Sequence, residues 1–275
     1  MDPLFSALTK QPEPARMHAP AHTSKGFLSG VVKGISWISG GALQKKVAQE
    51  ILPSLTFSKK ELASMQKIAR NELKHLTDVQ QSECRVEGCT LERIAFSASK
   101  KPMSERKIIV CFLPNYELWQ NKFYQFSEMR AEIGADIVCS NYRGCGKSTG
   151  FPKSEIDLVN DGLYQVQQLL DAGAKPENIA LYGYSLGGGI SMAVAASLED
   201  NAISVNVINE RSFRSLSAVV KSSDEFGKDI GAECISALGW NLPSEQYLAK
   251  LKGNVVVIHN DYDELIEYEP SLKGA

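Results

Sequence analysis

The chain has 275 residues, enough for one sizeable α/β domain or for two small ones. Hydrophobic residues make up 43% and charged residues 23%, which places the chain in the ordinary globular class. With a formal net charge of −2, it offers no basic face of the kind that binds a phosphate backbone, so a nucleic-acid partner is not expected.

The first residues predict a tail. Met1-Asp2-Pro3 is acidic, which is unlike a secretory signal, and prolines and alanines over residues 11–22 predict a disordered lead-in covering residues 1–25. The apolar stretch over residues 26–43 is interrupted by Lys33 and by several Gly and Ser, so it is too broken to span a bilayer. It predicts an amphipathic helix packed on the fold, with peripheral contact to a membrane or a partner as the alternative.

Residues 26–82 predict a helical N-terminal extension. Within it, Ser58 followed three residues later by Glu61 has the form of a capping box, and an apolar repeat follows as far as Leu73. We therefore expect a helix to begin directly after Ser58.

From about residue 84 to residue 275, short β-rich runs alternate with longer helical segments. This alternation predicts an α/β fold with a mostly parallel sheet flanked by helices on both faces. The expected strands are residues 90–96, 107–113, 136–142, 178–184, 203–209 and 254–259, and the expected helices are residues 116–133, 154–172, 186–198 and 213–222. Glycines and a proline over residues 225–250 predict an irregular insertion, a place where a lid could lie.

Six cysteines are spread along the chain. Cys111 and Cys139 sit in apolar runs, where a thiol is a small buried hydrophobe. Cys84 and Cys89 have no second pair of ligands nearby, so a zinc site is not expected, and neither is any other metal or cofactor. Free thiols and the lack of a signal peptide or transmembrane helix favour a cytoplasmic, reducing compartment.

The sequence around Ser185 carries the strongest chemical signal. Gly183, Ser185 and Gly187 form the pattern G-x-S-x-G, preceded by a β-rich run and followed by an apolar helix. In this strand–turn–helix setting a serine is held on a strained bend with its oxygen exposed. The alternative is a glycine-rich turn whose serine has a purely structural role.

Two further loops follow predicted strands. Residues 144–148 contain a glycine-rich stretch with Lys147 and Ser148, but the spacing of a phosphate loop is not met, so a sharply turning loop fits better than a nucleotide site. After the last strand, Asp263 is placed to orient a histidine as the acid of a triad, and Asp261 and Glu264 are its competitors.

Together these segments resemble the α/β-hydrolase superfamily, in its serine acyl-hydrolase branch. The resemblance is carried by N-Y-R-G-x-G-x-S-x-G at residues 141–150, G-Y-S-L-G-G at residues 183–188 and V-I-H-N-x-x-D-x-x-I at residues 257–266. The helical N-terminal region and Leu113-Pro114-Asn115 look like a subgroup found in intracellular bacterial pathogens, which would imply delivery into a host cell.

The resemblance implies that Ser185 attacks an acyl carbon of an ester, thioester or lipid without a cofactor. The oxyanion would be held by the backbone N–H of Leu186 and by a second N–H from the loop after the third strand. Pro114 has no N–H, so Asn115 or Tyr116 is expected to supply it.

The chain departs from the family at the catalytic base. The family order is Ser, acid, His, yet no histidine follows Asp263, and the four histidines present are His18, His22, His75 and His259. Two explanations stay open: a C-terminally truncated piece that lacks its last strand and helix, or a naturally shortened protein. We expect poor turnover from residues 1–275 alone and an open, aggregation-prone sheet edge. The alternative function is a non-catalytic module or remnant that binds a protein or lipid partner.

Overall fold

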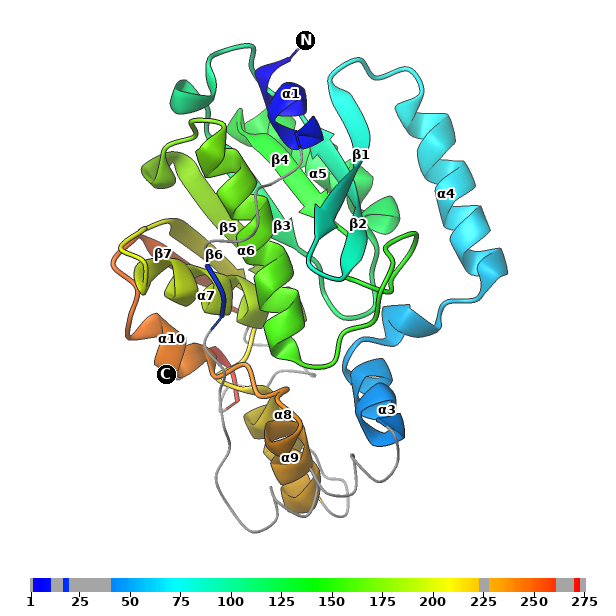
Figure 1. Ribbon diagram of the computed structural model, residues 1–275, viewed down its shortest axis with the longest axis vertical. Coiled ribbons are helices and arrows are strands. Elements are labelled where there is room, and N and C mark those ends of the chain that lie inside the picture. Colours follow the sequence, from blue (N-terminus) through cyan, green and yellow to red (C-terminus); the bar gives the residue numbers. More distant parts are fainter. Residues whose placement is uncertain (1, 11–16, 20–40, 223–227, 261–269, 273–275) are drawn as a thin grey trace.

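A seven-stranded sheet forms the centre of the computed structural model, which describes residues 2–10, 17–19, 41–222, 228–260 and 270–272 (Figure 1). The strand order is β1-β2-β4-β3-β5-β6-β7. Pairings from β4 through β7 are parallel, and only β1 with β2 and β2 with β4 are antiparallel, so the predicted mostly parallel sheet is confirmed. The strands are β1 Val79–Val86, β2 Cys89–Phe96, β3 Ile108–Phe112, β4 Asp136–Ser140, β5 Ile179–Tyr184, β6 Asn206–Glu210 and β7 Val255–Ile258.

Helices cover both faces of the sheet. All five residues of β3 and all five of β4 are buried, because helices pack above and below them. Helices α6 (Glu155–Asp171) and α7 (Leu186–Glu199) lie on one face, and α5 (Trp119–Ile133) lies on the other (Figure 1). The remaining described helices are α1 Pro3–Thr9, α3 Ala42–Ile51, α4 Lys59–Leu73, α8 Leu216–Ser222, α9 Lys228–Ala237 and α10 Ser244–Leu248, with 3₁₀ turns at Pro53–Thr56, Met103–Glu105 and Pro176–Asn178.

Helix α4 begins as the sequence predicts. The Ser58 side chain accepts a hydrogen bond from the Glu61 N–H at 3.2 Å, and the Glu61 carboxylate accepts one from the Ser58 N–H at 2.8 Å. Both halves of the capping box are therefore formed.

The disordered lead-in expected over residues 1–25 is wrong for its first part, because residues 3–9 form helix α1. Leu4 and Leu8 are fully buried, and the C-terminal end of α1 is held from far along the chain. Arg93, which is buried, donates to the Leu8 carbonyl, and the Gln168 side chain donates to the same carbonyl at 3.2 Å. Arg93 also donates to Gln168 Oε1 at 2.7 Å. A local start signal is present, since Asp2 accepts a hydrogen bond from the Leu4 N–H at 2.9 Å and Pro3 takes the first helical position. The prediction failed because so short a helix depends on distant partners that the sequence does not reveal.

The helical extension expected over residues 26–82 also needs correction, because β1 begins at Val79. This strand lies at the edge of the sheet and is polar along much of its length, so its pattern lacks the apolar run of a central strand. Residues 26–40, which include most of the apolar stretch expected to pack or to touch a membrane, lie outside the described residues.

The insertion expected over residues 225–250 is less irregular than its glycines suggest. Helices α9 and α10 lie within its described part, and α9 packs against α8. Of the helices in the described ranges, none combines the length and the apolar character that crossing a bilayer would require.

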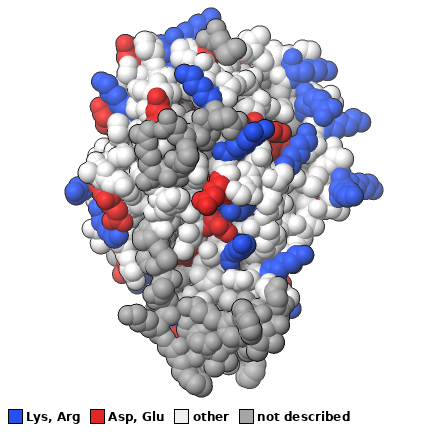
Figure 2. All heavy atoms as spheres, in the orientation of Figure 1, with Lys and Arg blue, Asp and Glu red and all other residues white. Residues whose placement is uncertain are grey.

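The opposite edge of the described sheet is apolar. The residues of β7 pair with β6 on one side only, and Val256, Val257 and Ile258 are 52%, 38% and 43% exposed. On the face seen in Figure 2, acidic and basic side chains are interspersed among uncharged residues and do not merge into one basic patch.

Candidate functional site

Ser185 occupies a sharp turn between β5 and α7. Its backbone has φ 54° and ψ −118°, a left-handed conformation that is strained for a residue with a side chain. The Ser185 N–H donates to the Glu210 carbonyl at 2.9 Å, and the Ser212 hydroxyl donates to the Ser185 carbonyl at 2.9 Å. The serine is half-buried, and the described chain provides no hydrogen-bond partner for its hydroxyl. The strand–turn–helix setting predicted from the sequence is present.

The glycines on either side of Ser185 allow three segments to approach closely. A Cβ on Gly183 would lie 2.1 Å from the Gly187 carbonyl oxygen, and a Cβ on Gly187 would lie 2.1 Å from the Phe112 carbonyl oxygen. Atoms cannot approach so closely, so a side chain at either position would push α7 away from β5 or β3. The glycines thus keep Ser185 at the tip of the turn and bring the end of β3 against the start of α7.

The loop after β3 contains the predicted second donor of an oxyanion hole. The Leu113 carbonyl accepts a hydrogen bond from the Tyr142 hydroxyl at 2.7 Å, and the Asn115 carbonyl accepts one from the Ser54 N–H at 3.3 Å. Within the described chain, no residue accepts a hydrogen bond from the N–H of Asn115, Tyr116 or Leu186. The backbone N–H groups of the three predicted donors are thus unpaired within the described chain, and their role in an oxyanion hole stays a prediction.

The glycine-rich loop at residues 144–150 is a structural turn. The Gly144 N–H donates to the Thr149 carbonyl at 3.0 Å, and the Lys147 N–H donates to the Glu92 carboxylate at 2.9 Å. In a phosphate loop such N–H groups would bind phosphate oxygens, but here the Glu92 carboxylate already accepts the hydrogen bond from the Lys147 N–H. The sequence prediction of a sharply turning loop agrees with this geometry.

Arg143 fixes this loop to α6. Its guanidinium donates to both carboxylate oxygens of Asp161, at 2.8 and 2.5 Å. Burial raises the pKa of Asp161 to about 6, although the paired Arg143 opposes the rise. The pair lies outside the turn that holds Ser185 and anchors the loop to the helix.

The predicted triad acid lies outside the described residues. Asp263 and its competitors Asp261 and Glu264 all fall within residues 261–269. Of the histidines, His259 directly follows β7, whereas His18 and His75 are exposed and belong to the N-terminal part of the chain. The arrangement of the predicted acid relative to Ser185 therefore stays a prediction.

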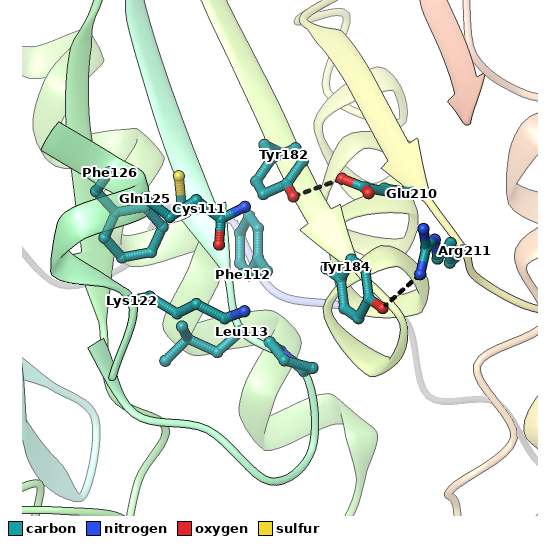
Figure 3. A pocket seen from close by; sticks show the side chains of 11 residues that line it. Cys111, Phe112, Leu113, Lys122, Gln125, Phe126, Tyr182, Tyr184, Glu210 and Arg211 are labelled. Atoms are coloured by element: carbon teal, nitrogen blue, oxygen red, sulfur yellow. Dashed lines mark hydrogen bonds between the residues drawn. The ribbon is translucent and has the colours of Figure 1, made fainter. Parts of the chain in front are cut away.

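A pocket of about 170 Å³ lies on the α5 face of the sheet, and Tyr184, the residue before Ser185, is part of its lining (Figure 3). Its polar side comes from the ends of β5 and β6 and from α5, and its apolar side comes from the end of β3, the following loop and Phe126 of α5. The lining residues are Cys111, Phe112, Leu113, Pro114, Lys122, Gln125, Phe126, Tyr182, Tyr184, Glu210 and Arg211.

The charged groups of this pocket are arranged around two tyrosines. The Tyr182 hydroxyl donates to Glu210 Oε2 at 2.6 Å, and the Arg211 guanidinium donates to the Tyr184 hydroxyl at 3.5 Å. Burial lowers the pKa of Lys122, which the nearby Glu210 charge partly offsets. Sequence reasoning missed these residues, because their proximity depends on strand register and on the packing of α5.

Comparisons with known proteins agree with the fold. A model of the family described as "Chlamydia CHLPS protein (DUF818)" matches residues 44–267. The protein bem46 of Schizosaccharomyces pombe is 26% identical over 136 residues, which are 49% of this chain and 44% of that protein. A multifunctional-autoprocessing repeats-in-toxin of Vibrio cholerae is 38% identical over 74 residues, which are 26% of this chain and 2% of the toxin. The chain thus spans less than half the length of these curated relatives.

Solved structures share the architecture at low sequence identity. An alpha-beta hydrolase from Vibrio vulnificus has a TM-score of 0.63 at 20% identity, covering 78% of this chain and 75% of that chain. Est1E from Butyrivibrio proteoclasticus, solved with ferulic acid bound, has a TM-score of 0.54 at 16% identity, covering 68% and 82%. The fold of the described residues is that of the α/β-hydrolases.

Proposed function

This chain belongs to the family described as Chlamydia CHLPS protein (DUF818), and from that premise we propose that it is a serine hydrolase acting on an ester, thioester or lipid acyl bond. The observation that carries the proposal is the strained backbone of Ser185 at the tip of the turn between β5 and α7. A non-glycine residue in this conformation costs free energy, and such strain is typical of functional positions.

In the proposed reaction the Ser185 hydroxyl gives its proton to a base while its oxygen attacks the acyl carbon. The tetrahedral intermediate then expels the leaving group, which takes up the proton, and water hydrolyses the acyl-enzyme to release the acid and restore the hydroxyl. The negative charge on the carbonyl oxygen is held by the N–H of Leu186 and by that of Asn115 or Tyr116. Each such donor contributes about 2.7–4 kcal/mol to lowering the barrier. Asp263 is the proposed acid.

The catalytic base is missing from its expected position, because the family order is Ser, acid, His and residues 1–275 contain no histidine after the proposed acid. No histidine follows Asp263, and His259 directly follows β7, before the acid. In a triad hydrolase the loss of the base lowers kcat by about 10⁶-fold. We therefore propose that residues 1–275 alone turn over esters too slowly to measure, although Ser185 stays accessible to a reactive probe.

The test uses a fluorophosphonate probe with added imidazole as an external base. Adduct formation on Ser185, located by peptide mass spectrometry, should rise with imidazole concentration, and Ser185→Ala should show none. Ser212→Ala is the matched control, because it removes a neighbouring hydroxyl that donates to the Ser185 carbonyl and keeps the nucleophile. If Ser185 stays unlabelled at saturating imidazole, the hydrolase proposal fails and a non-catalytic binding module becomes the better explanation.

The biological setting stays a prediction. Delivery into a host cell and membrane contact through residues 26–43 follow from the sequence analysis alone. The substrate that fits the proposed chemistry is a small molecule or lipid with an acyl bond.

A further inference from the structure

The pocket beside Ser185 contains a cation whose hydrogen-bonding capacity is largely unused. Arg211 has five N–H donors on its side chain, yet within the described chain its guanidinium donates a single hydrogen bond, to the Tyr184 hydroxyl at 3.5 Å. No described carboxylate lies within ion-pair distance of it. A guanidinium that is half-buried and lacks an anionic partner favours binding of an anion.

The neighbouring charges form no ion pair with Arg211, although the Glu210 carboxylate keeps its negative charge in the lining of the same pocket. Glu210, the residue before it, is engaged by the Tyr182 hydroxyl at 2.6 Å. Lys122 has its own partner, because its ammonium lies 2.8 Å from a Glu117 carboxylate oxygen. Lys122 nevertheless adds positive potential, since its ammonium lies 5.8 Å from the centre of the Tyr184 ring and the Arg211 guanidinium lies 6.0 Å from it.

The backbone of Arg211 is strained and is held by β7. Its φ is 46°, a left-handed conformation that is strained for an arginine, and its N–H donates to the Ile258 carbonyl of β7 at 2.8 Å. In Figure 3 the guanidinium and the Lys122 ammonium lie on either side of the Tyr184 ring. Strand pairing thus holds the Arg211 backbone, and the residue with this strained backbone is one that lines the pocket.

The size and walls of the pocket limit what it can hold. Its volume of about 170 Å³ is close to the roughly 150 Å³ of a cavity that accommodates benzene. Phe112, Leu113 and Phe126 form an apolar wall, while Arg211 and the tyrosine hydroxyls provide polar contacts. A flat anion with a short apolar part matches both sides, and an arginine fork binds a carboxylate through two parallel hydrogen bonds.

The pocket adjoins the proposed nucleophile through its own lining. Tyr184 precedes Ser185 in the chain, the Glu210 carbonyl accepts from the Ser185 N–H, and Leu113 and Pro114 belong to the loop that packs on the start of α7. We propose that this pocket binds a small organic carboxylate through Arg211, and that it receives a carboxylate group of the substrate while the acyl bond lies at Ser185. The second half of this inference rests on the proposed function, and the first half does not.

Binding is tested with butyrate as the probe, butyramide as its uncharged counterpart and inorganic phosphate as the competing anion. Butyrate should shift the amide NMR signals of Tyr184 and Arg211, and butyramide should not. Arg211→Gln should weaken butyrate binding about tenfold or more, since a hydrogen bond to a charged group contributes about 1.5–3 kcal/mol. Arg211→Lys should recover only part of the loss, because lysine keeps the charge but lacks the fork.

Lys122→Gln should weaken binding by a smaller factor, because its ammonium is already paired with Glu117. Arg85→Gln is the matched control, since it removes one positive charge from an exposed residue of β1 at the far edge of the sheet. Equal losses in Arg85→Gln and Arg211→Gln, or no shift with butyrate, would overturn the site. Tighter binding of phosphate than of butyrate would overturn the assignment to carboxylates.

The link to the nucleophile has a separate readout. Bound butyrate should slow the imidazole-assisted labelling of Ser185 in wild type and leave it unchanged in Arg211→Gln. If butyrate binds but does not slow the labelling of Ser185, the pocket plays no part in the reaction, and the second half of the inference is overturned. Binding that persists while Ser185 resists labelling altogether would show instead that the proposed hydrolase function has failed.

Discussion

Glu155 should make the folded state less stable as the pH rises from about 4.5 to about 7. This glutamate is the first residue of α6 and is 2% exposed, and its Oε2 accepts a hydrogen bond from the Leu242 N–H at 2.6 Å. Burial raises its pKa from 4.5 to about 7, although the hydrogen bonds from Leu242 and Asn241 oppose the rise. The folded protein therefore keeps this proton at pH values where the unfolded chain has released it.

The sign and size of the effect follow from that difference. Between about pH 4.5 and pH 7 the folded state binds more protons at Glu155 than the unfolded state does, so the free energy of unfolding falls with rising pH. One pKa unit corresponds to 1.36 kcal/mol, so the full rise is equivalent to about 3 kcal/mol, as an order of magnitude. The contribution is complete below pH 4.5 and is lost as the pH passes 7.

Urea unfolding at a series of pH values measures the effect directly. Glu155→Gln removes the ionisation while keeping an acceptor for the Leu242 N–H, so its free energy of unfolding should fall less steeply over this range. Glu245→Gln, at an exposed position of α10, is the control and should follow the wild-type curve. Asp161 titrates in the same direction with a pKa of about 6, so the comparison uses the difference between variant and wild type. Parallel curves for Glu155→Gln and wild type would refute the reasoning.

Three further predictions concern packing, capping and thiol reactivity. Gly187→Ala should destabilise the fold by about 3 kcal/mol in urea unfolding because its Cβ would overlap the chain of β3, whereas Gly231→Ala, in α9, should change stability by less than about 1 kcal/mol. Ser58→Ala should lower the free energy of unfolding by about 1 kcal/mol and speed amide exchange in the first turn of α4, whereas Ser58→Thr should stay close to wild type. Equal exchange rates in wild type and both variants would contradict the capping role. Iodoacetamide should modify half-buried Cys234 first, because the other five thiols are buried and burial raises the pKa of Cys89 to about 12. Mass spectrometry follows the order of modification, and earlier modification of Cys89 would count against this prediction.

The central strands and the Ser185 turn could be predicted because their signals are local. A strand buried on both faces must be apolar along its length, as β3 is, and the close approach of β5 to α7 requires glycine at Gly183 and Gly187. The capping box at Ser58 is equally local, since both partners lie within four residues. Such features leave a pattern in a short window of sequence.

The features that escaped prediction depend on distant partners. Strand β1 is polar because it lies at the sheet edge, and its pairing with β2 decides its conformation. The polar pocket exists because the register of β5 and β6 places Tyr184 opposite Glu210, and α5 then brings Lys122 across the same face. The predicted acid, Asp263, lies outside the described residues, so its distance from Ser185 stays a prediction.

The attachment of helix α1 has a consequence for the order in which the chain assumes its shape during synthesis. Arg93 and Gln168 donate hydrogen bonds to the Leu8 carbonyl, so helix α1 cannot complete its docking contacts until residue 168 has left the ribosome. Residues 3–9 are then made long before they can dock, and closing the long intervening loop slows assembly. In nascent chains arrested before residue 168, residues 3–9 should be cut readily by protease, and protection in those short chains would disprove this sequence of events.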